Sequence, residues 1–357
     1  QMCIRDSMIL WTQWLKAAYV LRPACHRART FVWMLLVLMG LCCRSDNAGV
    51  TSFVRVLNLG DQAYHRFLHL FHSTALDIDV LSACWARLCL VLFRPLQVGS
   101  RLVCLADGIK APKAPKEGKR MPGVKMLHQQ SQSNTKPEYI MGHSLQAISL
   151  LVHSAGGQVA AVPLASRIHE GLVFSNRDAR TLLDKLVVLL FTIVGAWSRQ
   201  ALLIADAYYA SAKVIAPLLA NGHQLITRAK SNAVAYMPVP TPEHRAKGRP
   251  RIYGDKARLK DLAQDDAAFT SGPSPVYGEV DVCVRYRVLD LMWRPVAKIV
   301  RFVIVRFVIV HHPLRGTIFL WSTDTSLEPL KILQLYGYRF KIELGFRQAV
   351  HVIGAYA

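Results

Sequence analysis

The stretch "ALLIADAYYASAKVIAPLLANGHQLITRA" occupies residues 201–229 and predicts a strand, a helix and a second strand. Its first segment is continuously apolar and ends at Asp206, which is typical of a buried strand. The middle segment is helical in pattern and is stopped by Gly222, a residue that commonly follows the last turn of a helix. This strand–helix–strand unit indicates an α/β fold built on a central sheet.

The segments that precede this unit add further strands to the sheet. Residues 101–107 form a short β-like run that ends in a second aspartate, Asp107. Residues 142–153 and 157–171 are joined by Ser-Ala-Gly-Gly, which is typical of a hairpin, and residues 178–194 predict a helix. The order is three strands, a helix, a strand, a helix and a strand. It predicts a three-layer α/β architecture in which helices flank a mixed sheet.

The composition is strongly basic. The chain has 357 residues, of which 44 are Lys or Arg and 23 are Asp or Glu, so its formal net charge is +21. An excess of this size indicates a polyanionic partner, and nucleic acid is the commonest one. The hydrophobic fraction of 52% allows a sizeable core and argues against global disorder.

The cysteines and the apolar runs exclude other classes of protein. The chain has 8 cysteines and no C-x-x-C pair, which argues against a zinc ribbon or a small disulfide framework and favours free thiols in a reducing cytoplasm. Residues 31–43 and 186–198 are uncharged and apolar, but both runs are shorter than the roughly 18 residues that a spanning helix needs. We therefore expect buried helices and no membrane partner, and a basic membrane-associated protein is disfavoured.

The chain divides into five parts by composition. The first seven residues resemble a non-native junction, and the last part is expected to be incomplete at its end. Between them we expect a helical region that is a candidate for DNA binding, the first part of an α/β core and a β-rich insertion. In chain order these parts are 1–7, 8–95, 96–229, 230–325 and 326–357, the last containing a C-terminal helix that completes the core.

A third acidic residue, Glu343, decides whether the two aspartates form a site. Hydrolysis of a phosphodiester by a two-metal site needs about three carboxylates, and Mg²⁺ prefers oxygen ligands. Asp107 and Asp206 stand at predicted strand ends, where α/β proteins place their active sites. Glu343 lies on a predicted helix with Arg339 and Arg347 one turn away on either side. An ion-paired helix face is the alternative interpretation of this helix.

The spacing of Tyr336, Arg339 and Glu343 matches Y-x-x-R-x-x-x-E. Together with the segments "LADGIK", "GKRMPGVKMLHQQSQSNTKPEYIMGHS", "LIADAYYAS" and "IELGFRQAVHVIGAY", it resembles the DDE-type insertion-sequence transposases, which have a ribonuclease-H-like catalytic core. The closest resemblance is to the bacterial group whose signature continues to a lysine seven residues after the glutamate. Val350 stands at that position here, which leaves the last DNA-backbone contact of the signature open.

The resemblance implies a mechanism and its partners. Asp107, Asp206 and Glu343 would be the catalytic residues and would bind two Mg²⁺ ions, for which Mn²⁺ can substitute. A water would first cleave the phosphodiester at a transposon end, and the freed 3′-hydroxyl would then attack target DNA. The partner would be double-stranded DNA, both transposon ends and target, bound by a homodimer. The location would be the bacterial cytoplasm, in association with the nucleoid.

The candidate DNA-binding residues lie near these carboxylates and in two basic loops. The pair Arg249 and Pro250 in "KGRPR" resembles a minor-groove hook, with a solvated basic loop as the alternative. The full set is Tyr336, Arg339, Arg347, Lys110, Lys119, Lys125 and Arg249. Two other functions remain open: a metal-dependent nuclease of the same fold that cuts without joining, and an inactive DNA-binding relative.

Overall fold

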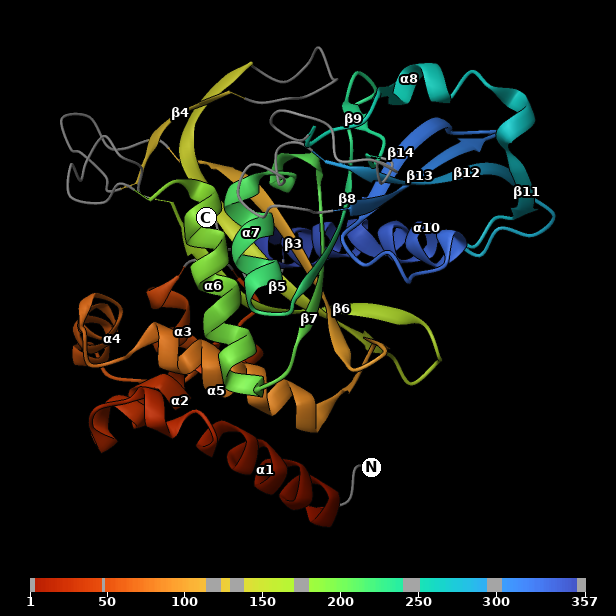
Figure 1. Ribbon diagram of the computed structural model, residues 1–357. Helices are drawn as coiled ribbons and strands as arrows, with labels where there is room; N and C mark the ends of the chain where they lie inside the picture. The colour runs from red at the N-terminus through yellow and green to blue at the C-terminus, as the bar shows by residue number, and fades with distance from the viewer. Residues whose placement is uncertain are drawn as a thin grey trace.

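The computed structural model describes residues 4–46, 49–113, 123–128, 138–169, 180–239, 251–293 and 304–351. A 14-stranded sheet with parallel and antiparallel pairs runs through the molecule. Helices α6 (Leu182–Trp197) and α7 (Ala212–Ala220) cover one face of the sheet, and α10 (Pro329–Gly337) lies against the other (Figure 1). The predicted α/β class, a mixed sheet flanked by helices, is confirmed.

Five strands form the part of the sheet that carries the aspartates. In spatial order they are β6 (Val159–Ile168), β5 (Tyr139–His153), β3 (Arg101–Pro112), β7 (Ala201–Ala205) and β8 (Gln224–Arg228). Strand β5 is antiparallel to both β6 and β3, whereas β7 is parallel to both β3 and β8. This arrangement is consistent with a ribonuclease-H-like nuclease fold.

Strand β3 is longer than the sequence predicts. It does not end at Asp107 but continues to Pro112, because residues 108–112 still pair with β5. The parallel pairing with β7 does stop there, since its last pair is Ala106 opposite Ala205. Asp107 and Asp206 are therefore the residues that directly follow this last pair, and they lie at the same level of the sheet.

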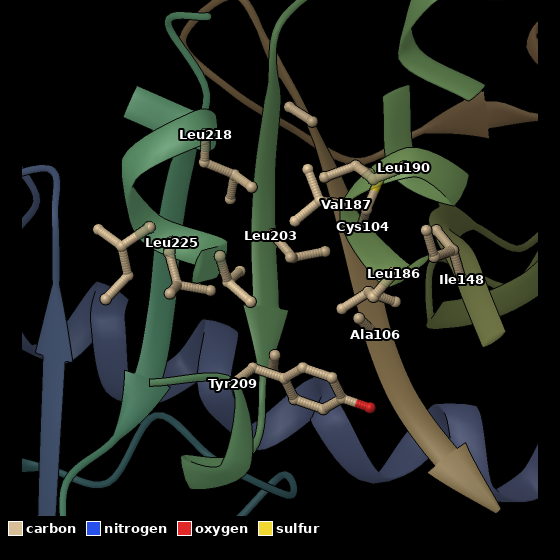
Figure 2. Close-up of a cluster of buried hydrophobic side chains, with 14 of the residues drawn as sticks. Cys104, Ala106, Ile148, Leu186, Val187, Leu190, Leu203, Tyr209, Leu218 and Leu225 are labelled. Carbon is tan, nitrogen blue, oxygen red and sulfur yellow. The ribbon is translucent and has the colours of Figure 1, made fainter. Parts of the chain in front are cut away.

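The two faces of the central strands enter two hydrophobic cores. Alternate residues of a strand point to opposite faces. On one face Cys104, Leu203 and Leu225 pack with α6 and α7 around Tyr209, as Figure 2 shows. On the other face Leu105, together with neighbours from β7 and β8, packs against α10. Because both faces are covered, the continuously apolar sequence of β7 is explained.

The two apolar runs lie in helices that pack against other elements. Residues 186–198 fall largely in α6, which begins at a capping box formed by Thr181 and Asp184. Residues 31–43 fall in α2 (Ala28–Cys43), where Phe31 is buried. No helix within the described ranges combines the length and the apolarity required to cross a membrane.

The N-terminal helices form a separate layer at one end of the sheet (Figure 1). The last of them, which contains Ala86, also contacts α6, because the indole of Trp197 donates a hydrogen bond of 2.8 Å to the carbonyl of Ala86. These helices are α1 (Ile4–Tyr19), η1 (Arg22–Ala24), α2, α3 (Val50–Val56), α4 (Gln62–His72) and α5 (Ile78–Leu92).

The region after β8 contributes more strands to the same sheet. Strand β14 pairs antiparallel with β8, and β13 and β12 follow outward. The elements are β9 (Val234–Tyr236), β10 (Lys256–Arg258), α8 (Leu259–Leu262), η3 (Asp266–Ala268), β11 (Thr270–Pro273), β12 (Cys283–Met292), β13 (Ile304–His312) and β14 (Gly316–Ser322). Elsewhere lie β1 (Arg94–Pro95), β2 (Gln97–Val98), β4 (Lys125–His128), η2 (Ala207–Tyr209), η4 (Tyr338–Phe340) and α11 (Lys341–His351).

A buried polar cluster holds the outer strands to the preceding loop. Glu279 accepts hydrogen bonds from Ser274 and Arg315, the latter at 2.6 Å, and contacts Nε2 of His312 at 2.9 Å. These hydrogen bonds, that of Ser274 first, lower the pKa of Glu279 to about 2 from its ordinary 4.5. A carboxylate with this many donors is stabilised in its charged form.

The depressed pKa of Glu279 predicts a specific loss of stability in acid. Because its pKa is lower in the folded state, the ionised carboxylate stabilises the fold above pH 4.5, and this contribution is lost as the pH falls toward 2. We expect Glu279→Gln to flatten the pH dependence of the urea unfolding midpoint over this acid range. The exposed Glu328→Gln is the matched control, and an equal flattening in both variants would contradict the assignment.

Candidate active site

Asp107 is held by two hydrogen bonds that fix the direction of its carboxylate. One oxygen accepts the backbone N–H of Gly108 at 2.8 Å, and the other accepts Nη1 of Arg339 at 2.7 Å. The side chain is 17% exposed, so part of the carboxylate reaches solvent just past the last residue pair between β3 and β7. A strand within a sheet is a rigid support, and this carboxylate is therefore pre-positioned.

Asp206 follows β7 and begins the short turn η2. Its carboxylate accepts the backbone N–H of Tyr208, which is a capping contact at the start of the turn. Its carbonyl accepts the hydroxyl of Thr227, a fully buried residue of β8, at 2.8 Å. The neighbouring parallel strand thus anchors the main chain of Asp206 on the side away from β3.

Arg339 connects Glu343 to Asp107 by hydrogen bonds to both carboxylates. The guanidinium of Arg339 donates from Nη2 to Glu343 at 3.0 Å while its Nη1 donates to Asp107. Arg339 lies in η4 and Glu343 one turn later in α11, so both side chains extend from the same helical face. The sequence separates Asp107 and Glu343 widely, and a single arginine brings their carboxylates to one place.

The charges of the three carboxylates act on one another. The pKa of Asp107 is raised mainly because the group is buried, and the negative charges of Asp206 and Glu343 raise it further. The positive charge of Arg339 and the N–H of Gly108 oppose this rise. Asp206 and Glu343 therefore both lie close enough to Asp107 for their charges to act on it. That the three carboxylates together form one metal site stays a prediction.

A buried pair lies on the opposite face of the sheet. The hydroxyl of Tyr209 donates to the side-chain carbonyl of Gln146, and both residues are buried on the α6 face, whereas Asp107 alternates with Leu105 onto the α10 face. Gly108 lies directly against Gln146, since a Cβ atom at position 108 would meet its Nε2 at 2.6 Å. A side chain at position 108 would therefore have to displace the amide of Gln146, which is hydrogen-bonded to Tyr209.

A groove of about 710 Å³ opens beside Asp206. It is lined by Asp206, Tyr336 and Arg339, and on its far wall by the exposed Arg228 and Lys230. Burial is the main cause that raises the pKa of Tyr336, and the positive charge of Arg228 acts in the opposite direction. The groove therefore joins a carboxylate to basic side chains, a combination that suits a phosphate backbone next to a metal-binding carboxylate.

Sequence analysis missed Arg228 and Lys230. A usable signal was present, because both residues follow the apolar run of β8. Parallel neighbouring strands end at the same edge of a sheet, so residues after β8 are expected beside Asp206. The lysine-rich loop after Asp107 contains more basic residues and is therefore the stronger signal in the sequence.

The other predicted DNA-binding residues have different surroundings. Lys110 donates to the carbonyl of His128 between β3 and β4, and the pKa of Lys125 is lowered by burial and by Lys185. Arg347 is exposed on α11. Lys119 and Arg249 lie outside the described residues, so both remain predictions. Tyr336 and Arg339 are the two members of the predicted set that line the groove.

The three acidic residues have the donor atoms that a divalent metal requires. Carboxylate oxygens are the protein ligands that Mg²⁺ prefers. A cationic group, the guanidinium of Arg339, already lies between Asp107 and Glu343, so this position attracts positive charge. As the side chains stand, no group of three His, Cys, Asp or Glu residues in the described ranges is arranged to hold an ion. The donor set fits, and Arg339 has to move for Asp107 and Glu343 to share a metal.

A ribonuclease-H-like sheet with a carboxylate cluster at the end of its parallel strands defines a nuclease of the DDE class. Residues 20–271 match the family model described as DDE superfamily endonuclease, and the chain belongs to this family. The match includes Asp107 and Asp206 and ends before Glu343. The family supports an endonuclease- or transposase-type function on DNA, generally with a divalent metal. No match is found among the curated proteins.

Proposed function

We propose that this protein is an insertion-sequence transposase that cleaves DNA at transposon ends and joins the freed 3′-hydroxyl to target DNA. The observation that carries the proposal is the contact of Arg339 with both Asp107 and Glu343, beside Asp206. It links Asp107, one of the two aspartates of the family match, to a glutamate beyond that match. The spacing of Tyr336, Arg339 and Glu343 supports the transposase over other members of the family.

Each residue of the site has a role in this proposal. Asp107, Asp206 and Glu343 would hold two Mg²⁺ ions, which when bound activate the attacking oxygen and stabilise the leaving oxygen. Arg228 and Lys230 would hold the phosphate backbone along the groove, and Tyr336 would donate to a phosphate oxygen. Arg339, once released from the carboxylates, would pair with a phosphate.

The remaining parts of the chain fit a larger assembly. We propose that residues 8–95 contribute DNA binding, that 96–229 and 326–357 make up the catalytic core and that 230–325 form its insertion. Strand β14 extends the sheet from β8, so the insertion would be rigidly attached to the core. A homodimer on the DNA would let two transposon ends be processed together, in a bacterial cell at the nucleoid.

A joining assay separates transposition from simple cleavage. Purified protein with Mg²⁺ is given a pre-cut transposon end carrying a free 3′-hydroxyl, together with a supercoiled plasmid. The end sequence is taken from inverted repeats that flank the coding sequence. We expect covalent joining of the labelled end to the plasmid, with Mn²⁺ also effective. A protein that nicks uncut ends but never joins pre-cut ones is instead a nuclease of this fold.

The second candidate function has an observation in its favour. Val350 stands where the transposase signature has a lysine, so this chain would lack the DNA-backbone contact that the lysine provides. An enzyme that holds the DNA end less firmly would release it after cutting. Val350→Lys tests this directly: if the natural protein cuts without joining and the variant joins, loss of this contact is the cause. Binding without any cleavage would identify an inactive relative.

A further inference from the structure

We propose that a basic pocket between α2 and α4 is a separate binding site for the phosphate backbone of duplex DNA. It lies in the N-terminal helical layer, where α2 and α4 pack side by side (Figure 1). The pocket has a volume of about 580 Å³, and its lining includes Arg27, Arg29 and Arg66. The inference rests on the DNA substrate of the family and does not depend on strand transfer.

The pocket has a fixed frame. The segment before α2 is tied to the segment after α4 by a β-bridge between Cys25 and Leu76 and by a hydrogen bond of 3.0 Å from the N–H of His26 to the carbonyl of Ala75. Thr30 is buried in its wall. The arginines at the start of α2 are thereby held opposite Arg66 of α4 before any ligand binds, which lowers the cost of binding.

The charges around the pocket are of one sign. Arg27, Arg29 and Arg66 are all exposed, and none has a carboxylate oxygen within 4.0 Å in the described part of the chain. No Asp or Glu is among the residues that line the pocket. Elsewhere in the same layer an arginine is neutralised, since Arg55 pairs with Asp46 at 2.8 Å. The pocket therefore concentrates positive charge that the protein itself does not balance.

Two further features fit an anion. Helix α2 begins at this pocket, its first turn has no acidic residue, and no side chain caps it, so its N–H groups remain available. Arg66 lies over the ring of Trp33, with its guanidinium carbon 5.8 Å from the ring centroid. This stacking orients the guanidinium, which donates from Nη2 to the side-chain carbonyl of Gln62 at 3.5 Å and has further N–H groups that can donate to a phosphate. His69, one turn after Arg66, adds another donor.

The partner is the phosphate backbone and not the bases. The pocket gathers several cations at fixed places beside a helix N-terminus without a side-chain cap, and these are the groups that bind phosphate oxygens. Contacts of this kind hold a duplex in position without selecting its sequence. We therefore expect the pocket to bind DNA outside the cleaved bond, and to do so without a metal ion.

The test measures DNA binding in EDTA, where the carboxylate site cannot act. Fluorescence anisotropy with a duplex is recorded over a range of salt concentrations for the full chain and for Arg27→Ala, Arg29→Ala and Arg66→Ala. Each variant is expected to reduce the slope of log affinity against log salt by about one and to weaken binding several-fold, whatever the duplex sequence. Arg55→Ala is the matched control because that arginine is already paired. Thermal unfolding checks that each variant is folded.

Three results would overturn the inference. The salt slopes of all three folded variants could equal that of the natural protein, or Arg55→Ala could lower the slope as much as they do. Alternatively, the variants could lose affinity for inorganic phosphate or duplex RNA while binding duplex DNA normally. Failure of the catalytic proposal gives a different result. The natural protein would then not join DNA ends in Mg²⁺, while the arginine variants would still reduce the salt slope of DNA binding in EDTA.

Discussion

Asp206→Asn is expected to abolish metal-dependent nicking of DNA, with a loss of about 10³-fold or more. The substitution keeps the shape of the side chain and can still accept the N–H of Tyr208, so the start of η2 is preserved. It removes one negative charge from a group of three that must hold divalent cations. Asp107→Asn and Glu343→Gln are expected to cause losses of the same order, because the three carboxylates act as one site.

The measurement is conversion of supercoiled plasmid carrying a transposon end to the nicked form, with Mg²⁺ or Mn²⁺ in excess. Asp261→Asn is the matched control, since that aspartate is exposed and lies away from the groove. Binding of the same DNA in EDTA should be kept in all variants, which separates a lost reaction from a lost fold. Natural rates of nicking in the three site variants would refute the assignment of these carboxylates.

The central sheet is predictable because its strands carry strong local signals. Residues 201–229 have a buried strand, a helix and a second strand in immediate succession, and the structure has β7, α7 and β8 there. The end of β3 was predicted wrongly because the local sequence pattern contains no information about which strand pairs with it. Residues 108–112 read Gly-Ile-Lys-Ala-Pro and include two residues that are unfavourable in strands, yet β5 continues to pair with them. Tertiary pairing extended the strand past Asp107.

The site is predictable only in part, for a different reason. Residue spacing identifies the three acidic residues, but it contains no information about which side chain contacts which. Arg339 was expected to face DNA, and in the structure both of its donor groups are engaged by carboxylates. Its direction is set by how α10 and α11 meet through η4, a bend that periodicity does not specify. Lys110 similarly turned to a backbone carbonyl of β4.

Arg339→Gln is expected to strengthen metal binding and to weaken DNA cleavage. The guanidinium lies between Asp107 and Glu343, so it occupies space and supplies charge that a divalent cation would otherwise take. Without the guanidinium, the negative charges of Asp107 and Glu343 repel each other with no cation between them. A bound metal ion would relieve this repulsion and would therefore bind more tightly than in the natural protein. The same change deprives the groove of a phosphate donor, so cleavage should fall although the metal binds better.

Two measurements on one variant test these opposite effects. Mn²⁺ affinity, followed by electron paramagnetic resonance without DNA, should rise several-fold, and in EDTA the variant should unfold more easily, by about 1–2 kcal/mol given that Arg339 and Asp107 are largely buried. Lys331→Gln, which removes an exposed charge from α10, should change neither quantity. Weaker Mn²⁺ binding in Arg339→Gln would mean that the arginine organises the carboxylates for the metal. In that case metal entry would not have to displace it.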